Sequence, residues 1–254
     1  MLREVLAADV FKLLLVFARL GAAIMVFPGF GSNVVLVRAR LVLAVSIAFL
    51  LMPSLAGRLP KMPADPTGMT LLLASEVTIG LFFGLLMHTL RASLDLAGNA
   101  IGYSMGLTNV FTFDPITEQQ SQLIPGFLNL MAITMIFVTD THHLMLRAIV
   151  DSYGVFVPGQ ALPVDDMSET LVRTVSASFL VGLKLAAPSI IFAMTFNTGL
   201  ALLNRLVPQI QVFFVGMPIH ILAGIGVLTL ALPPILFWYL RHFTEGFSAF
   251  LSTG

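Results

Sequence analysis

Long apolar runs alternate with short polar or helix-breaking segments along the whole chain. Residues 28–40 are Gly-rich and basic, residues 53–68 hold four prolines, and residues 157–166 are rich in Pro and Asp, so all three segments are expected to interrupt helices. A helix needs about 20 apolar residues to cross a bilayer. We therefore predict an all-α membrane protein with about six long apolar helices, at 10–28, 41–57, 70–90, 123–138, 175–203 and 213–240.

One segment, residues 91–122, does not follow this alternation. Its first half is less apolar and amphipathic, and its second half is polar at Asp114-Pro115 and at residues 118–122. Proline biases the preceding residue away from the helical conformation. We predict an amphipathic helix that is followed by an irregular loop at 109–122.

Glycines recur at four-residue spacing near the middle of the chain. Gly80 and Gly84 share one face of a predicted helix with Glu76, and Gly102 and Gly106 continue the spacing through the amphipathic segment. Small residues on one face let another helix approach closely in a membrane protein. The alternative is that these glycines face lipid, where membrane helices tolerate them. Close helix packing is the favoured interpretation.

Composition supports a membrane setting and excludes several other classes of protein. Hydrophobic residues make up 57% of the 254 residues and charged residues only 10%, whereas a soluble domain carries about 25% charge. The net charge is zero, which argues against a nucleic-acid partner. Because the chain has no cysteine, it offers no thiolate nucleophile, disulfide or Cys-based metal site. Basic residues fall on both sides of a six-span chain, so the positive-inside rule leaves the orientation open.

Polar side chains also occur within or beside the apolar runs. Each costs about 2.5–3.5 kcal/mol on insertion into a bilayer, so each is expected to face protein or water. They could form a proton or substrate path, but Glu76 is the only carboxylate in the interior of its helix, and we favour interhelical contacts. If that carboxylate only packs, Glu76→Gln should be tolerated and Glu76→Leu should not. The residues concerned are Lys12, Arg19, Glu76, His88, Asp140 and Lys184.

Adjacent histidines at His142 and His143 raise the question of a metal site. Neighbouring side chains on a helix point about 100° apart, and no further His or carboxylate follows them at a distance of three or four residues. We therefore predict neither a metal site nor a cofactor.

Four motifs occur in order along the chain. The first runs from Phe17 to Gly31 and closes with Pro28-Gly29-Phe30-Gly31, and the second is Glu76 with Gly80 and Gly84. The third is the stretch 102–106, Gly102-Tyr103-Ser104-Met105-Gly106, before Asp114-Pro115. The fourth and most specific is Pro208-Gln209-Ile210-Gln211, which leads into Phe213, Gly216 and Pro218 between two apolar runs. In order and approximate spacing these motifs resemble the FliR-type family of flagellar and type III secretion export-gate subunits.

The last third of the chain carries a second resemblance. The stretch from Gly182 to Pro188, the apolar run to Leu203 and the segment 209–218 are similar to the small FliQ-type subunit, which is a helical hairpin. Pro188 and Pro233-Pro234 should kink its two arms, and Pro208 and Gly216-Met217-Pro218 should form a turn between them. The resemblances imply two parts: residues 1–167 pack like a FliP-type subunit, and residues 168–254 like a FliQ-type hairpin.

The family resemblance implies a function without catalysis. The chain would be a subunit of the type III export gate in the bacterial inner membrane, in the core of a flagellar or secretion basal body. With FliP-like and FliQ-like subunits it would form a helical channel for unfolded exported proteins, in contact with an FlhB-like protein and with membrane lipids. The sequence does not distinguish a flagellum from an injectisome.

Three groups of residues are assigned roles on this basis. The loop at 109–122 is predicted to plug the channel through Phe111, Phe113, Asp114 and Pro115. A cytoplasmic turn is predicted to contact the FlhB-like partner through Pro208, Gln209, Gln211, Phe213, Gly216 and Pro218. Helix packing and buried polar contacts are assigned to Arg19, Glu76, Gly80, Gly84, Gly102 and Gly106.

A secondary transporter is the alternative function. Helices broken at Pro188 and Pro233-Pro234 could surround an ion site, as in transporters that are built from two similar halves. The two halves of this chain share no spacing of that kind, so the export function is favoured.

Overall fold

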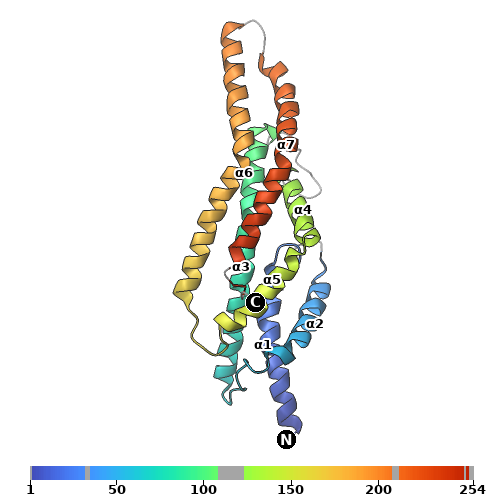
Figure 1. The fold of residues 1–254 in the computed structure, drawn as a ribbon, viewed down its shortest axis with the longest axis vertical. Coiled ribbons are helices and arrows are strands. Elements are labelled where there is room, and N and C mark those ends of the chain that lie inside the picture. The colour runs from blue at the N-terminus through green and yellow to red at the C-terminus, as the bar shows by residue number, and fades with distance from the viewer. Residues whose placement is uncertain (1, 32–34, 108–122, 208–211, 249, 252–254) are drawn as a thin grey trace. The chain divides into compact units, whose positions relative to one another are not determined.

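A computed structural model describes residues 2–31, 35–107, 123–207, 212–248 and 250–251. Within these ranges the chain forms seven helices and no strand, which confirms the all-α prediction. The helices, labelled in Figure 1, are α1 (Leu2–Val26), α2 (Val37–Leu55), α3 (Pro66–Ser104), α4 (Leu123–Val138), α5 (Thr141–Val155), α6 (Val164–Leu206) and α7 (Val212–Ser248).

Every predicted apolar run falls on one of these helices. α3 also continues through the amphipathic part of segment 91–122 and ends at Ser104, just before Gly106 with its φ of 70°. A left-handed glycine beyond the last helical residue is a common helix stop, because it has no Cβ to clash with the backbone. α5 was not predicted, because Arg147 and Asp151 interrupt its apolar positions.

The turn predicted to extend to Pro218 is wrong in its second half. Gly216 and Pro218 lie inside α7, which begins at Val212. A proline removes one backbone hydrogen bond, but helix propagation is cooperative, and neighbouring groups re-satisfy the backbone around prolines in membrane helices. For the same reason other prolines lie within helices without ending them, namely Pro53, Pro188, Pro233 and Pro234.

The number of possible membrane spans is smaller than the number of apolar runs. By length and composition, α2, α3, α6 and α7 could each cross a membrane, and α4 with α5 passes the same test as one broken pair. The described residues therefore supply four spans, or five if the broken pair is one of them. Charged residues recur along α1, at Asp9, Lys12 and Arg19 among others.

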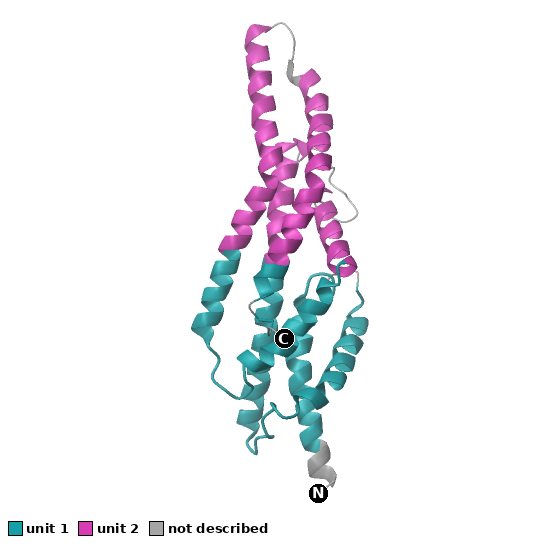
Figure 2. Cartoon of the chain, viewed as in Figure 1, with its two compact units in different colours: residues 1–89, 139–175, 244–254 teal, residues 90–138, 176–243 magenta. Residues whose placement is uncertain are grey.

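The chain divides into two compact units, coloured in Figure 2. The first comprises residues 1–89, 139–175 and 244–254, and the second comprises residues 90–138 and 176–243. Both are assembled from separate stretches of sequence. The division of the chain at residue 167 into FliP-like and FliQ-like parts therefore stays a prediction about family likeness.

An aromatic cluster lies in the core of the first unit. Phe82 and Phe83 of α3 meet Phe156, which follows α5, and Phe250, near the end of the chain. Most of these rings meet edge to face at centroid separations of 5.0–6.1 Å, an arrangement that stabilises beyond the burial of area alone. The cluster joins α3 to the segments that follow α5 and α7.

Close backbone approaches hold the second unit together. A Cβ added to Gly98 of α3 would lie 2.7 Å from Cα of Pro125 in α4, and one added to Gly182 of α6 would lie 2.6 Å from the carbonyl oxygen of Ser93. Neither position has room for a larger residue. The α3 to α4 and α3 to α6 contacts of this unit therefore depend on glycine.

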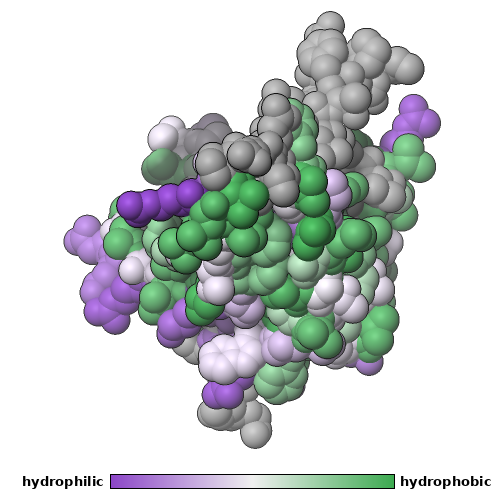
Figure 3. Space-filling model, turned by 90° about the horizontal axis from the view of Figure 1, so that it is seen from above, coloured by the Kyte–Doolittle hydropathy of each residue, from purple (hydrophilic) through white to green (hydrophobic). Residues whose placement is uncertain are grey.

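Much of the exterior is apolar. In α2, Val42, Phe49 and Leu50 are 63–73% exposed, and in α7, Leu222 and Leu230 are 71–83% exposed. Figure 3 shows apolar residues over much of one face, with hydrophilic residues in separate patches. Such a surface suits lipid or apolar protein neighbours.

Candidate functional site

A fully buried ion pair lies at the centre of the first unit. Nε of Arg19 in α1 donates to Glu76 of α3 at 2.6 Å, and Nη2 donates to the second carboxylate oxygen at 3.0 Å. Both side chains are 0% exposed. A two-bond contact of this kind uses the planar guanidinium fully and fixes the orientation of both groups. It joins α1 to α3 across 57 residues of sequence.

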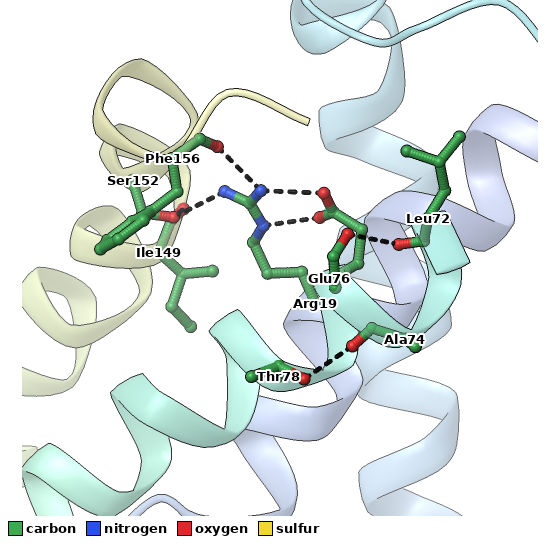
Figure 4. Close-up of polar contacts among 9 residues, drawn as sticks. Arg19, Leu72, Ala74, Glu76, Thr78, Ile149, Ser152 and Phe156 are labelled. Carbon is green, nitrogen blue, oxygen red and sulfur yellow. Dashed lines mark hydrogen bonds and ion pairs between the residues drawn. The ribbon is translucent and has the colours of Figure 1, made fainter. Parts of the chain in front are cut away.

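The remaining donors of Arg19 reach the last turn of α5 and the residue that follows it. Nη1 donates to the hydroxyl of Ser152 at 3.0 Å, and Nη2 donates to the carbonyl of Phe156 at 3.0 Å (Figure 4). The guanidinium carbon also lies 3.8 Å from the centre of the Tyr153 ring, at a distance that gives a cation–π attraction. One arginine thus joins three helices of the unit.

Glycines bring α3 close enough to α1 for this pair to form. Gly80 lies one turn after Glu76, and a Cβ there would overlap the carbonyl oxygen of Arg19 itself. A Cβ at Gly84, one turn further, would lie 2.6 Å from Cβ of Val26. The four-residue spacing places Glu76, Gly80 and Gly84 on one face of α3, and the structure brings that face against α1.

The chemistry of the pair favours a structural role. Both carboxylate oxygens of Glu76 accept hydrogen bonds from Arg19, and a guanidinium does not give up its proton in proteins. A group that carries protons must exchange them with water or with another titratable group. Instead, the buried Glu76 carboxylate is paired with the permanently charged guanidinium of Arg19, as expected of a contact that holds two helices together.

A second polar cluster lies between α3 and α4 in the second unit. Arg91 donates to the side-chain oxygen of Asn129 at 3.3 Å and lies 3.4 Å from the carboxylate of Asp95, and the Asn129 amide donates to Asp95. The three groups are partly buried. None of the three was predicted as a site residue, although the four-residue spacing of Arg91 and Asp95 is that of a helical ion pair.

A cavity of about 970 Å³ also lies in the second unit. His220 of α7 lines it, is 9% exposed, and stacks on the ring of Phe196 at 4.7 Å. Nε2 of this histidine has no hydrogen-bond partner among the described residues. His220 was not predicted as a site residue, although its place as a histidine inside the apolar run 213–240 was a signal for it. The other polar side chains of the lining are Asn99, Tyr103, Ser104 and Asn197.

The structure places the remaining predicted residues in different ways. Gly102 makes an ordinary contact, since a Cβ there would lie 3.7 Å from Ile124. Gly216 is close to Leu200 of α6, and a Cβ there would lie 2.7 Å from that side chain. Phe213 lies in the first turn of α7. The residues of the predicted plug and the first part of the predicted turn lie outside the described residues: Phe111, Phe113, Asp114, Pro115, Pro208, Gln209 and Gln211.

Helices that are long and apolar enough to cross a membrane, with large exposed apolar side chains, define a helical membrane protein. Residues 10–246 match the family described as "Bacterial export proteins, family 1", and the chain belongs to this family. Relatives with the name "Flagellar biosynthetic protein FliR" include that of Caulobacter vibrioides, 35% identical over 94% of this chain and 95% of the relative. The protein of the same name from Pectobacterium carotovorum is 34% identical over 86% of this chain and 83% of the relative. That from Bacillus subtilis is 30% identical over 82% of this chain and 81% of the relative. The chain is therefore a membrane-embedded export component of flagellar biosynthesis.

Proposed function

We propose that the chain is a non-catalytic subunit of the flagellar type III export gate in the bacterial inner membrane. With FliP-like and FliQ-like subunits it forms a helical channel through which unfolded proteins leave the cytoplasm. The observation that carries the proposal is the family match over residues 10–246, together with the flagellar relatives that extend over most of the chain. The same match favours protein export over the alternative of a small-solute transporter.

The surface of the second unit supports assembly with other subunits. α6 and α7 expose large apolar side chains on several faces, including Ile191 and Met194 of α6 and Phe214 and Trp238 of α7, which are 56–71% exposed. Helices that build a channel need such faces for their neighbours. Their exposure in the single chain is consistent with burial in an assembly.

Two further parts of the proposal concern residues outside the described ranges. The loop at 109–122 plugs the closed channel, with Phe111 and Phe113 as the apolar barrier, because an apolar constriction can close a pore by dewetting. The segment at 208–211 faces the cytoplasmic entrance, where the amides of Gln209 and Gln211 can donate to and accept from the backbone of an FlhB-like partner.

Co-purification tests the proposal most directly. The full chain, tagged and expressed with the FliP-like, FliQ-like and FlhB-like proteins of the same bacterium, should elute with them as one detergent-stable complex. Deleting its gene should abolish secretion of flagellar proteins while the other subunits are still made. A chain that is monodisperse alone, does not co-purify and is dispensable for secretion would contradict the proposal.

A further inference from the structure

A cluster of three side chains at the start of α5 lies apart from the buried ion pair. It comprises Asp140, His142 and His143, all in the first unit. We propose that this cluster binds a divalent transition-metal ion of the Zn²⁺ type through two imidazole nitrogens and one carboxylate oxygen. The inference does not depend on the export function.

The third ligand comes from Asp140, which precedes the histidine pair, whereas the prediction of no metal site considered only the residues that follow it. Asp140 precedes α5 with φ 55° and ψ 15°, and it is the single non-glycine residue with positive φ in the described chain. Its side chain does not cap the helix, although Asp is a favoured capping residue. The carboxylate lies instead 3.6 Å from Nδ1 of His143.

The two imidazoles also lie close together. Their ring centres are 4.1 Å apart, and one ligand atom from each of the three residues lies within 4.8 Å of the others. Ligands at about 2.0–2.2 Å from one Zn²⁺ ion can be at most about 4.4 Å apart. Asp140 and His143 are 77% and 69% exposed, so a small rotation of exposed side chains brings the set within range.

The donor set determines which ion fits. Imidazole with one carboxylate suits Zn²⁺, Ni²⁺ and Cu²⁺, whereas Mg²⁺ and Ca²⁺ prefer oxygen ligands throughout. The N-terminus of α5 carries roughly half a positive unit charge, which opposes a cation, but the full negative charge of Asp140 exceeds it. Three protein ligands leave a fourth position open to water.

Binding there would tie the first turn of α5 to the residue before the helix. The same helix carries Ser152, which accepts a hydrogen bond from Arg19. The ion would therefore stabilise the first turn of the helix whose last turn completes the buried polar contact of the unit.

Metal titration of the full-length chain in detergent tests the site. Zn²⁺ alone should bind saturably with one ion per chain, and Mg²⁺ should not compete. Asp140→Asn keeps a residue that tolerates the left-handed backbone, while it removes the ligand charge. His142→Gln and His143→Gln each remove one imidazole, and His88→Gln is the matched control outside the cluster.

Each cluster variant should weaken Zn²⁺ binding by at least about tenfold, because even partners outside the first coordination sphere are worth 10–100-fold in affinity. The control variant should bind as the unaltered chain does. Zn²⁺ should also raise the thermal unfolding midpoint of the unaltered chain but not that of Asp140→Asn. Absence of saturable Zn²⁺ binding, or equal Zn²⁺ affinity of all four variants, would overturn the proposal. The thermal unfolding midpoint of each variant without metal shows whether that variant has folded.

Discussion

The carboxylate of Glu76 and the guanidinium of Arg19 face each other with two hydrogen bonds of 2.6 and 3.0 Å, and neither side chain reaches solvent. Removing two charges from water costs free energy that their mutual attraction only partly recovers. The pair is therefore weak evidence for net stability. Loss of one partner, in contrast, leaves a buried charge with no counter-charge.

This pairing changes the expectation for Glu76→Gln. From the sequence alone, an amide at this position should preserve the contact, but beside Arg19 it removes the only negative charge of the pair. We expect Glu76→Gln and Glu76→Leu each to lower the free energy of unfolding by about 3–5 kcal/mol. The double variant Arg19→Met with Glu76→Leu leaves no buried charge. Its loss of unfolding free energy should therefore be clearly smaller than the sum of the losses for Arg19→Met alone and Glu76→Leu alone.

Thermal unfolding followed by circular dichroism in detergent measures these differences. The exposed pair of Arg173 and Glu169 is the matched control, since Glu169→Gln should change stability by less than about 1 kcal/mol. Wild-type stability of Glu76→Gln would show that the carboxylate is not the counter-charge of Arg19.

Arg19→Lys is expected to behave as a disruptive change. A lysine ammonium is a single point of charge with no planar fork, so it cannot donate to both Glu76 oxygens, to Ser152 and to Phe156 together. We expect a loss of at least about 2 kcal/mol, within the range for breaking charged hydrogen bonds. Arg173→Lys, on the exposed surface, is the control for the same chemical change. Equal unfolding midpoints for the two lysine variants would refute the multi-helix role of Arg19.

Gly80→Ala should destabilise the chain, whereas Gly199→Ala should not. A Cβ at Gly80 meets the backbone of α1, which cannot move as a flexible side chain does, while a Cβ at Gly199 has nothing within 4 Å. Overpacking costs about 1–3 kcal/mol, and replacing an exposed helical glycine by alanine gains up to about 1 kcal/mol. Opposite shifts of the unfolding midpoint in the purified chain are the expected result. If both substitutions shift it in the same direction, the close approach of α3 to α1 is not rigid.

Removal of the proposed plug should open the channel while the complex stays assembled. Deletion of residues 110–117, or alanine at Phe111 and Phe113, should increase leakage of ions from cells and change secretion less than permeability. Phe49→Ala, on the exposed face of α2, is the control for loss of an aromatic ring. An assembled complex that stays ion-tight without the loop would exclude a plug role.

Cysteines at Gln209 and Gln211 should crosslink to the FlhB-like protein in intact membranes. The chain has no cysteine of its own, so each introduced thiol reports on one position. A cysteine at the exposed Lys61 serves as the control for nonspecific crosslinking. Labelling of positions 209 and 211 from the periplasmic side alone would place this segment on the wrong face for the proposed partner.

Local patterns in the sequence determined the helices and the membrane setting. Hydrophobic runs indicated six of the seven described helices, because a helix that faces lipid or a buried core leaves a continuous apolar signal in one stretch of chain. The spacing of Glu76, Gly80 and Gly84 likewise indicated a shared face, since the helical period alone sets it. α5 carries a weaker signal and went unpredicted.

The tertiary structure alone decided which of these faces meet. Arg19 and Glu76 were both recognised as costly polar residues, but their pairing across 57 positions depends on how α1 and α3 pack. The positive φ of Asp140, which brings its carboxylate toward His143, is likewise invisible in a pattern of hydrophobicity. Sequence periodicity fixes the direction of a side chain relative to its own helix. A contact between distant residues also requires that two helices lie in the right relative position, and packing throughout the unit determines that position.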